Sequence, residues 1–429
     1  MKYLPIDSQL FINNRERFVS KTKRNSLAVF NSNDIYNTGA DSTLPFTQHR
    51  DIFHLSGVDQ EESVLVIFPD CKNKLHREIL FLKETSEHIA VWEGEKLTKE
   101  KAIEVSGIKT IYWLDQFETI FRQLVIESES VYLNSNEHLR TSNSMETRED
   151  RFVKKFISDF PIHPTLRVAP IMHQIRSVKD SIEIEIMKKA CDITERGFRR
   201  ILSFIKPEVM EYEIEAELMH EFLSNRSKGF AYTPIIASGK SACVLHYIEN
   251  NKSCKDGDII LMDFGAEYAN YASDLTRCVP VNGKFTSRQK EVYNSVLRVK
   301  NEATKLLNPG VFLNDYHKEV GKFMEEELLK LNLISSKDIQ NQDSKWPAYK
   351  KYFMHGTSHY IGLDTHDVGS WTEPIEENMV FTVEPGIYIP EEGIGIRLED
   401  DVVVQKNSAP KNLMENIPIE AEEIEDLMN

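Results

Sequence analysis

The stretch LMDFGAEYANYASDLTR, Leu261 to Arg277, predicts a β-hairpin that brings two carboxylates together. Asp263 and Asp274 are separated by an odd number of positions, which would place them on opposite faces of one continuous strand. A turn at Tyr268-Ala269 instead pairs position 263 with position 274, so the two aspartates become direct cross-strand neighbours. The sequence therefore predicts an antiparallel hairpin in which two like charges face each other.

A second hairpin repeats this arrangement in FTVEPGIYIPEEGIGIRLEDDV, residues 381–402. A β-turn at Pro390-Glu391-Glu392-Gly393 pairs Glu384 with Glu399. Like charges directly opposite each other destabilise a sheet unless one carboxylate is protonated or a cation lies between them. In a chain with 68 acidic residues one such match could arise by chance. Two matches favour a bound cation.

The donors available to such a cation are oxygen and nitrogen atoms. The five cysteines are widely spread and form no CxxC pair, so neither a disulfide framework nor a thiolate zinc site is expected. Four carboxylates and one imidazole suit manganese, cobalt, iron or zinc, and the oxygen-rich set favours Mn²⁺ over Co²⁺, Fe²⁺ or Zn²⁺. Four acids exceed the need of one ion, so we expect two divalent ions and a bridging hydroxide as nucleophile.

The segment HGTSHYIGLDTHDVG, His355 to Gly369, contains three candidate imidazoles. His355 and His359 have the spacing of an HExxH zinc motif, but Gly356 occupies the glutamate position and glycine disfavours helix. One of the three histidines is expected to be the nitrogen ligand, and the other two to orient ligands or bind substrate. His246, in ACVLHYIEN, would by default be a partly buried structural residue on a strand.

Charge and hydropathy exclude several other functions. Lys and Arg number 52 and Asp and Glu 68, and the resulting net charge of −16 argues against nucleic acid or an anionic membrane surface as a partner. No apolar run approaches the roughly 18 residues of a spanning helix. The amino terminus lacks the apolar core of a secretory signal, so we expect a cytoplasmic protein.

The chain is long enough for two domains. Residues from about 25 to 140 alternate short β-rich runs with helical connections, which indicates a small α/β domain. A polar segment begins at Ser135 and a second break follows at Pro164 and Pro170, so we expect this domain to span 1–172. Asp180 and Glu183 resemble a capping box that opens an amphipathic helix. Further helices over about 210–225, 287–307 and 314–332 separate strand runs, which include ACVLHY. An α+β domain with an antiparallel sheet is therefore expected at 173–429.

With HGTSHYIGLDTHDVG, LMDFGAEY, SDLTR, TVEPGIYI and GIGIRLEDD in this order, the chain resembles the M24 or pita-bread metallopeptidases. It looks most like bacterial aminopeptidase P, the Xaa-Pro aminopeptidases, over almost its whole length. The resemblance implies a curved antiparallel sheet covered by helices in the carboxy-terminal domain, preceded by the smaller α/β domain.

Position by position, the resemblance implies a dinuclear metal site. Asp263 would bind one ion, Asp274 and Glu399 would bridge the pair, and His359 and Glu384 would bind the other. Glu384 would also move a proton from the attacking water.

The resemblance also implies substrate-binding residues. His246 and His366 match residues that hold the substrate and its tetrahedral intermediate, and His355 matches one that lines the site for the residue after the scissile bond. Arg397 matches an arginine near the ligands, where its charge would offset the acidic cluster.

The implied reaction is hydrolysis of the bond between an amino-terminal residue and a proline in second position. The substrates would be peptides with a penultimate proline, whose tertiary amide has no N–H and a fixed φ. The resemblance also implies a homodimer or homotetramer, in which the amino-terminal domain helps to close the site. Trp92 matches a tryptophan at that edge.

Three alternatives share the fold. A prolidase, which cleaves Xaa-Pro dipeptides, has the same ligands, although Ser358 leans toward aminopeptidase P. A methionine aminopeptidase normally lacks the large amino-terminal domain. A catalytically inactive peptide-binding module usually loses metal ligands, and all five are present here.

Overall fold

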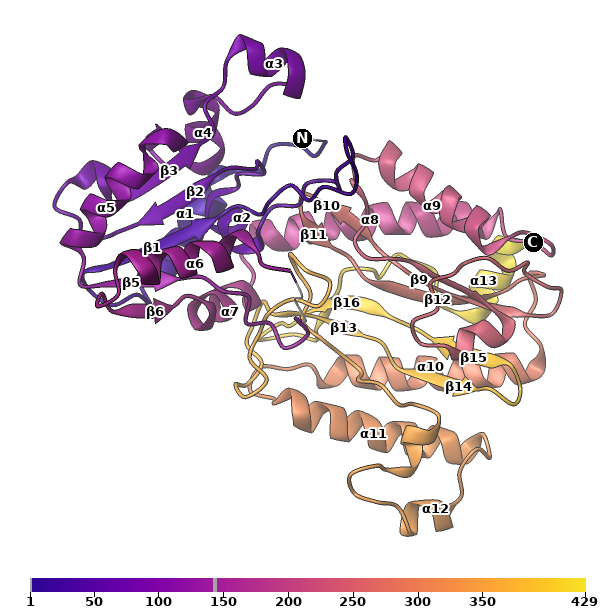
Figure 1. The fold of residues 1–429 in the computed structure, drawn as a ribbon. Coiled ribbons are helices and arrows are strands. Elements are labelled where there is room, and N and C mark those ends of the chain that lie inside the picture. Colours follow the sequence, from indigo (N-terminus) through magenta and orange to yellow (C-terminus); the bar gives the residue numbers. More distant parts are fainter. Residues whose placement is uncertain (1, 142–144) are drawn as a thin grey trace. The chain divides into compact units, whose positions relative to one another are not determined.

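The computed structural model describes residues 2–141 and 145–429, which divide into two compact units, Tyr3–Arg176 and Ser177–Asn429 (Figure 1). Residues 142–144, within the polar segment that begins at Ser135, lie outside the described residues. None of the helices in the described part of the chain combines the length and the apolarity that a bilayer crossing requires.

The first unit is built on a mixed sheet with strand order β4-β3-β2-β1-β5-β6. The pairs β1–β2 and β2–β3 are antiparallel, and β3–β4, β1–β5 and β5–β6 are parallel. The strands are β1 (Ser26–Asn31), β2 (Val64–Ile67), β3 (Glu78–Leu82), β4 (Thr110–Trp113), β5 (Ser130–Leu133) and β6 (Thr165–Arg167).

Helices cover both faces of this sheet. Ala28 and Phe30 of β1 pack with residues of α1, α2, α4 and α7, whereas Leu27 and Val29 pack with residues of α5 and α6. Both faces are apolar because alternate side chains of a strand point to opposite sides. The helices are α1 (Ser8–Val19), α2 (Arg50–Ser56), α3 (Glu87–Glu93), α4 (Lys99–Ser106), α5 (Phe117–Glu127), α6 (Arg148–Asp159) and α7 (Ala169–Ser177), with 3₁₀ turns η1 (Lys74–His76) and η2 (Leu114–Gln116).

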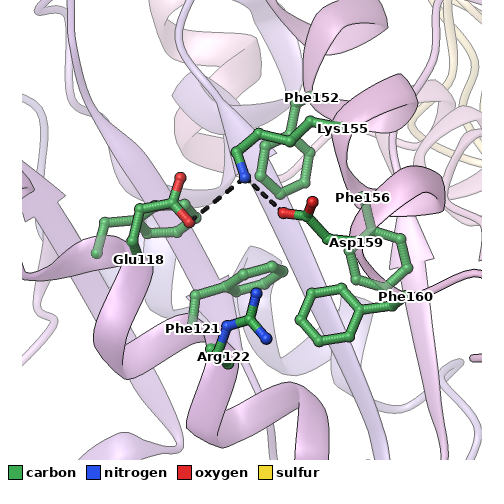
Figure 2. Close-up of a pocket in the computed structure, with 9 residues that line it drawn as sticks. Glu118, Phe121, Arg122, Phe152, Lys155, Phe156, Asp159 and Phe160 are labelled. Carbon is green, nitrogen blue, oxygen red and sulfur yellow. Dashed lines mark hydrogen bonds and ion pairs between the residues drawn. The ribbon is translucent and has the colours of Figure 1, made fainter.

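Phenylalanines of α5 and α6 interlock on the second face (Figure 2). The rings of Phe117 and Phe121 stack with centroids 5.0 Å apart, and both side chains are buried. At the rim, Arg122 lies over the ring of Phe160 and Lys155 pairs with Asp159. The rings of Phe117 and Phe121 therefore belong to the core of this unit, and the hollow beside them is lined by both aromatic and charged side chains.

The second unit contains several short antiparallel sheets. Their strand orders are β11-β10-β7, β12-β9-β8, β13-β16-β17 and β14-β15. The strands are β7 (Gly229–Phe230), β8 (Ile235–Ser238), β9 (Ile259–Phe264), β10 (Ala266–Tyr268), β11 (Tyr271–Ala272), β12 (Leu275–Pro280), β13 (Val380–Val383), β14 (Gly386–Ile389), β15 (Ile394–Arg397), β16 (Asp400–Val403) and β17 (Lys411–Asn412).

Two pairs of helices cover these strands, with α8 and α9 on one side and α10 and α11 on the other (Figure 1). The predicted capping box at Asp180 and Glu183 is confirmed, since the Asp180 side chain accepts from the Ile182 N–H and the Glu183 side chain accepts from the Asp180 N–H. The helices are α8 (Ser181–Leu202), α9 (Glu211–Ser224), α10 (Ser287–Leu306), α11 (Leu313–Lys330), α12 (Ser336–Gln340) and α13 (Ala421–Met428), with η3 (Gly239–Cys243) and η4 (Ala348–Lys351).

The first hairpin exists, but its predicted register is wrong by two residues. Asp263 pairs with Thr276 rather than with Asp274. The turn is formed by Ala269 and Asn270, which have φ values of 54° and 68°. A two-residue type I′ turn requires positive φ at both positions, and asparagine tolerates this conformation. A shift of two residues preserves the face, so Asp263 and Asp274 become diagonal neighbours on the same side.

The register of the second hairpin is confirmed. Val383 pairs with Asp400 in the β13–β16 ladder, and Gly386 pairs with Arg397 in the β14–β15 ladder. Both ladders have the register that pairs Glu384 with Glu399, and that pair lies between them. The turn is the predicted one, closed by a hydrogen bond from the Gly393 N–H to the Pro390 carbonyl.

The strand predicted for ACVLHY is wrong. Its first residues belong to η3, and the chain then bends through an exposed loop that carries His246. Val244 and Ile248 in this loop are 55% and 56% exposed. Among the described residues no strand pairs with this run, and Val244 faces solvent whereas Ala242 and Tyr247 are buried, so the run lacks the ladder that would stabilise an extended strand.

Replacement of Gly265 by alanine should disrupt the first hairpin. A Cβ at this position would lie 1.7 Å from the Ser273 carbonyl oxygen, a backbone atom that cannot move without shifting Asp274. We expect Gly265→Ala to lower the free energy of unfolding by about 2–3 kcal/mol or more, as overpacking does in tight cores. Urea unfolding would measure this loss. Gly39→Ala, with no atom nearer than 3.9 Å, is the control, and equal losses in the two variants would contradict the expectation.

Candidate metal centre

The two hairpins of the second unit meet edge to edge at the candidate site. Thr276 and Glu399 form an isolated β-bridge, in which the Glu399 N–H donates to the Thr276 carbonyl at 3.1 Å. This bridge joins β12 to the segment that precedes β16. Side chains alternate between the two faces along each strand. Asp274 and Thr276 of the first hairpin therefore share one face with Glu399 of the second.

Three buried groups converge most closely. Donor atoms of Asp274, His359 and Glu399 all lie within 4.8 Å of one another. Nε2 of His359 is 3.5 Å from Oδ2 of Asp274 and 3.6 Å from Oε1 of Glu384. The structure therefore brings a predicted imidazole together with three of the four predicted carboxylates.

Asp263, the fourth carboxylate, is linked to the others by Tyr232. The Tyr232 hydroxyl donates to Oδ1 of Asp263 at 2.6 Å and also lies within hydrogen-bonding reach of Oδ1 of Asp274. On its other oxygen Asp263 accepts a hydrogen bond from Nη2 of Arg397. All five predicted metal ligands thus belong to one contiguous cluster.

Burial, together with the charges of neighbouring acids, raises the pKa values of several of these carboxyl groups. Burial, reinforced by the negative charge of Asp263, raises the pKa of Asp274 well above its usual range. Burial and the charges of Asp274 and Glu384 do the same to the pKa of Glu399. Burial also raises the pKa of Glu384 to about 7, against the opposing effects of His359 and Arg397. The anionic form of this cluster therefore needs positive charge nearby.

The imidazole of His359 is oriented to act as a ligand through Nε2. Its Nδ1 lies 3.0 Å from the Tyr360 carbonyl oxygen, which can only accept, so Nδ1 carries the proton. The lone pair of Nε2 then faces Asp274 and Glu384. A backbone carbonyl that fixes the tautomer in this way is typical of metal-binding histidines.

A hydrogen-bonded chain connects Asp263 to His355. Arg397 donates from Nη2 to Asp263 and from Nη1 to the Tyr388 hydroxyl at 2.8 Å. Nδ1 of His355 donates to the Gly356 carbonyl, so its Nε2 accepts from the Tyr388 hydroxyl at 2.8 Å. Burial and the charge of Arg397 lower the pKa of His355 to about 3, which keeps the imidazole neutral at physiological pH.

The remaining predicted residues lie at the margin of the cluster. The ring of His366 is exposed and its centroid is 4.3 Å from that of His359. His246 is exposed on the loop after η3, and its charge contributes to the lowered pKa of His355. Trp92, in the first unit, is 77% exposed on α3.

Three contributors to the site were missed by sequence reasoning. Tyr388 and Thr276 could have been found, because Tyr388 shares its strand face with Glu384 and Thr276 shares its face with Asp274. Thr276 donates to Oε2 of Glu399 at 2.6 Å and accepts from Nε of Arg397. Tyr232 precedes β8 in an irregular segment, and no periodic pattern pointed to it.

The residues fit a divalent metal centre. The donor set is carboxylate and imidazole, it is largely buried, and its acids are held close enough to raise their own pKa values. Hard to borderline divalent ions prefer these donors and would relieve the repulsion between them.

Comparison with known proteins assigns the family. Residues 185–406 match Metallopeptidase family M24, and residues 11–132 match the aminopeptidase P amino-terminal domain. This chain belongs to metallopeptidase family M24. It is 32% identical to the Xaa-Pro aminopeptidase of Haemophilus influenzae over 98% of this chain and 97% of that protein. It is also 32% identical to the Xaa-Pro aminopeptidase of Escherichia coli, over 99% and 98% of the two chains.

The fold agrees with a solved structure. Zinc-substituted Escherichia coli aminopeptidase P in complex with product superposes with a TM-score of 0.89 at 31% identity, covering 99% of each chain. The predicted α+β architecture, with a pita-bread domain after a smaller α/β domain, is confirmed for this M24 protein.

Removal of the Tyr388 hydroxyl should break the chain from Arg397 to His355. Tyr388→Phe leaves a buried guanidinium N–H and an imidazole nitrogen without their partner, which costs about 1–3 kcal/mol. We expect a loss of stability of this size in urea unfolding and a fall of about tenfold in kcat/KM. Tyr293→Phe, which removes a buried hydroxyl that donates to the Ile419 carbonyl, is the matched control. A similar fall in kcat/KM for both variants would contradict a specific role for Tyr388.

Proposed function

We propose that this protein is a Xaa-Pro aminopeptidase, which releases the amino-terminal residue from peptides with proline in second position. The observation that carries the proposal is the convergence of Asp274, His359, Glu384 and Glu399, with Asp263 linked through Tyr232, on one face of two joined hairpins. Its full-length similarity to named Xaa-Pro aminopeptidases supports the same reaction.

We propose that two divalent ions are held by five residues, which are Asp263, Asp274, His359, Glu384 and Glu399. The oxygen-rich donor set supports Mn²⁺, with Co²⁺, Zn²⁺ or Fe²⁺ as alternatives. When bound, these ions would supply Lewis-acid chemistry that polarises the scissile carbonyl and the attacking water.

Glu384 would move the proton in this reaction. Addition of water to the scissile carbonyl carbon releases a proton, and rupture of the C–N bond requires a proton on the proline nitrogen. A carboxylate beside the attacking water can accept the first proton and return it to the leaving nitrogen. The position of Glu384 beside His359 and near His355 puts it between the proposed metal ligands and the proposed leaving-group side.

Histidines would orient the substrate. His246 and His366 are exposed at the margin of the cluster, where they can donate to the substrate and to its tetrahedral intermediate. His355 is neutral, its ring is fixed edge-on against the buried rings of Phe353 and Tyr388, and its own partly exposed face would contact the pyrrolidine ring. Such a surface suits a proline, which offers no N–H for recognition.

The first test is an assay of a Xaa-Pro-Xaa tripeptide with metal-free and Mn²⁺-loaded protein. We expect hydrolysis only after Mn²⁺ is added, because the acidic cluster alone has no group to polarise the carbonyl. Asp274→Ala should lower kcat by about a thousandfold or more, as loss of a key electrostatic contributor does. Rapid hydrolysis by Asp274→Ala at the wild-type rate would rule out this centre.

Substrate length separates the proposed activity from that of a prolidase. We expect kcat/KM for a Xaa-Pro-Xaa tripeptide to exceed that for the dipeptide Gly-Pro by about tenfold or more, because an aminopeptidase gains binding energy from residues beyond the proline. Product release measured by chromatography gives both values. A preference for Gly-Pro would indicate a prolidase, and cleavage of Met-Ala peptides would indicate a methionine aminopeptidase.

We propose a cytoplasmic location and a homodimeric or homotetrameric state. All five cysteines are free thiols, as is common in a reducing compartment.

The exposed side chains of Val91 and Trp92 on α3 offer apolar area for a subunit contact. We propose that the amino-terminal domain, 1–172, serves such contacts and controls substrate access to the catalytic domain, 173–429.

A further inference from the structure

A second charged cluster lies directly behind Glu399, on the other face of the strand. Asp400 follows Glu399 in the chain, so its side chain points away from the acidic cluster and toward α10. There it accepts hydrogen bonds from Nη2 of Arg277 at 2.6 Å and from Lys300 of α10. All three side chains are at least 96% buried.

The cluster carries one more cation than anion. Arg277 already matches the charge of Asp400, and Asn412 also donates to Oδ2 of Asp400 at 2.8 Å. Asp400 therefore has partners on both oxygens without Lys300. Burial of an ammonium group costs several kcal/mol unless its charge is matched nearby, so the charge of Lys300 requires another anion.

The backbone of Glu399 connects these buried cations to the acidic cluster. Arg277 donates from Nη1 to the Glu399 carbonyl at 2.7 Å, which ties the backbone of a proposed metal ligand to the buried cations. Burial lowers the pKa of Lys300, and the charges of Asp400 and, to a smaller extent, Glu399 oppose that shift and favour its charged form. Arg397 offsets the negative charge of the acids on the face that carries them. Lys300 and Arg277 offset this charge from the opposite face of the strand.

We propose that Lys300 is an internal counter-ion of the acidic cluster, which stabilises the gathered carboxylates and weakens their hold on divalent cations. Lys300 is thus a positioning residue, and this role rests on the metal centre proposed above. Removal of the Lys300 charge should strengthen metal binding, whereas loss of a purely structural contact would weaken it.

The test is calorimetric titration of Mn²⁺ into metal-free variants of the full chain. Lys300→Met conserves length and removes the charge. At an effective dielectric of about 20, a unit charge even about 15 Å from a divalent ion changes its affinity by about tenfold or more. We expect Lys300→Met to bind Mn²⁺ about tenfold more tightly than wild type, and Lys300→Gln, which can still donate to Asp400, to do the same.

Thermal unfolding with and without Mn²⁺ provides a second readout. Tighter binding increases the stabilisation that a ligand provides, so the rise in Tm on adding Mn²⁺ should be larger in Lys300→Met than in wild type. Asp400→Asn removes the negative charge but keeps Lys300 and Arg277. Its affinity for Mn²⁺ should therefore change in the opposite direction and be about tenfold weaker. A structural contact alone would weaken binding in both variants.

Lys290→Met is the matched control, because it removes one lysine from the same helix at a surface ion pair with Glu422. Its Mn²⁺ affinity should equal that of wild type. Wild-type or weaker affinity in both Lys300→Met and Lys300→Gln would overturn the proposal while leaving the metal centre intact. Failure of the wild-type protein itself to take up Mn²⁺ would instead overturn the metal centre, and the role of Lys300 with it.

Discussion

The second unit depends on keeping like charges together in a sheet that would otherwise separate them. Asp263, Asp274, Glu384 and Glu399 come from two hairpins far apart in the chain, and the bridge between Thr276 and Glu399 joins the hairpins at the point of greatest repulsion. Burial, and then the repulsion between the acids, raises the pKa values of Asp274, Glu384 and Glu399. Natural sheets avoid such pairs, so their presence here indicates a binding site rather than a stabilising element.

Most of this arrangement could be predicted from the sequence because strand periodicity is insensitive to small errors of register. The turn of the first hairpin is displaced to Ala269 and Asn270, yet the resulting shift of two residues leaves Asp263 and Asp274 on one face. The turn at Pro390 to Gly393 is specified more strongly by its residues, and its register was predicted correctly. An error of one residue would have moved the acids to opposite sides.

The parts that could not be predicted lie where tertiary contacts override local pattern. ACVLHY has the composition of a strand, but no strand of the described residues pairs with it, and His246 is carried on an exposed loop. Tyr232 lies in an irregular segment, and its role follows only from the convergence of Asp263 and Asp274 around its hydroxyl. Composition and periodicity describe which residues are compatible with an element, whereas these positions are decided by residues distant in the chain.

His355 and His359 illustrate how the surroundings give different roles to identical side chains. His355 and His359 both donate from Nδ1 to a backbone carbonyl, so both present an Nε2 lone pair. The lone pair of His355 is occupied by the Tyr388 hydroxyl, which Arg397 orients in turn. The lone pair of His359 faces Asp274 and Glu384, where only a cation can satisfy all three groups at once. The spacing of the two residues in the sequence does not reveal this difference, because the difference depends on which strand lies opposite each imidazole.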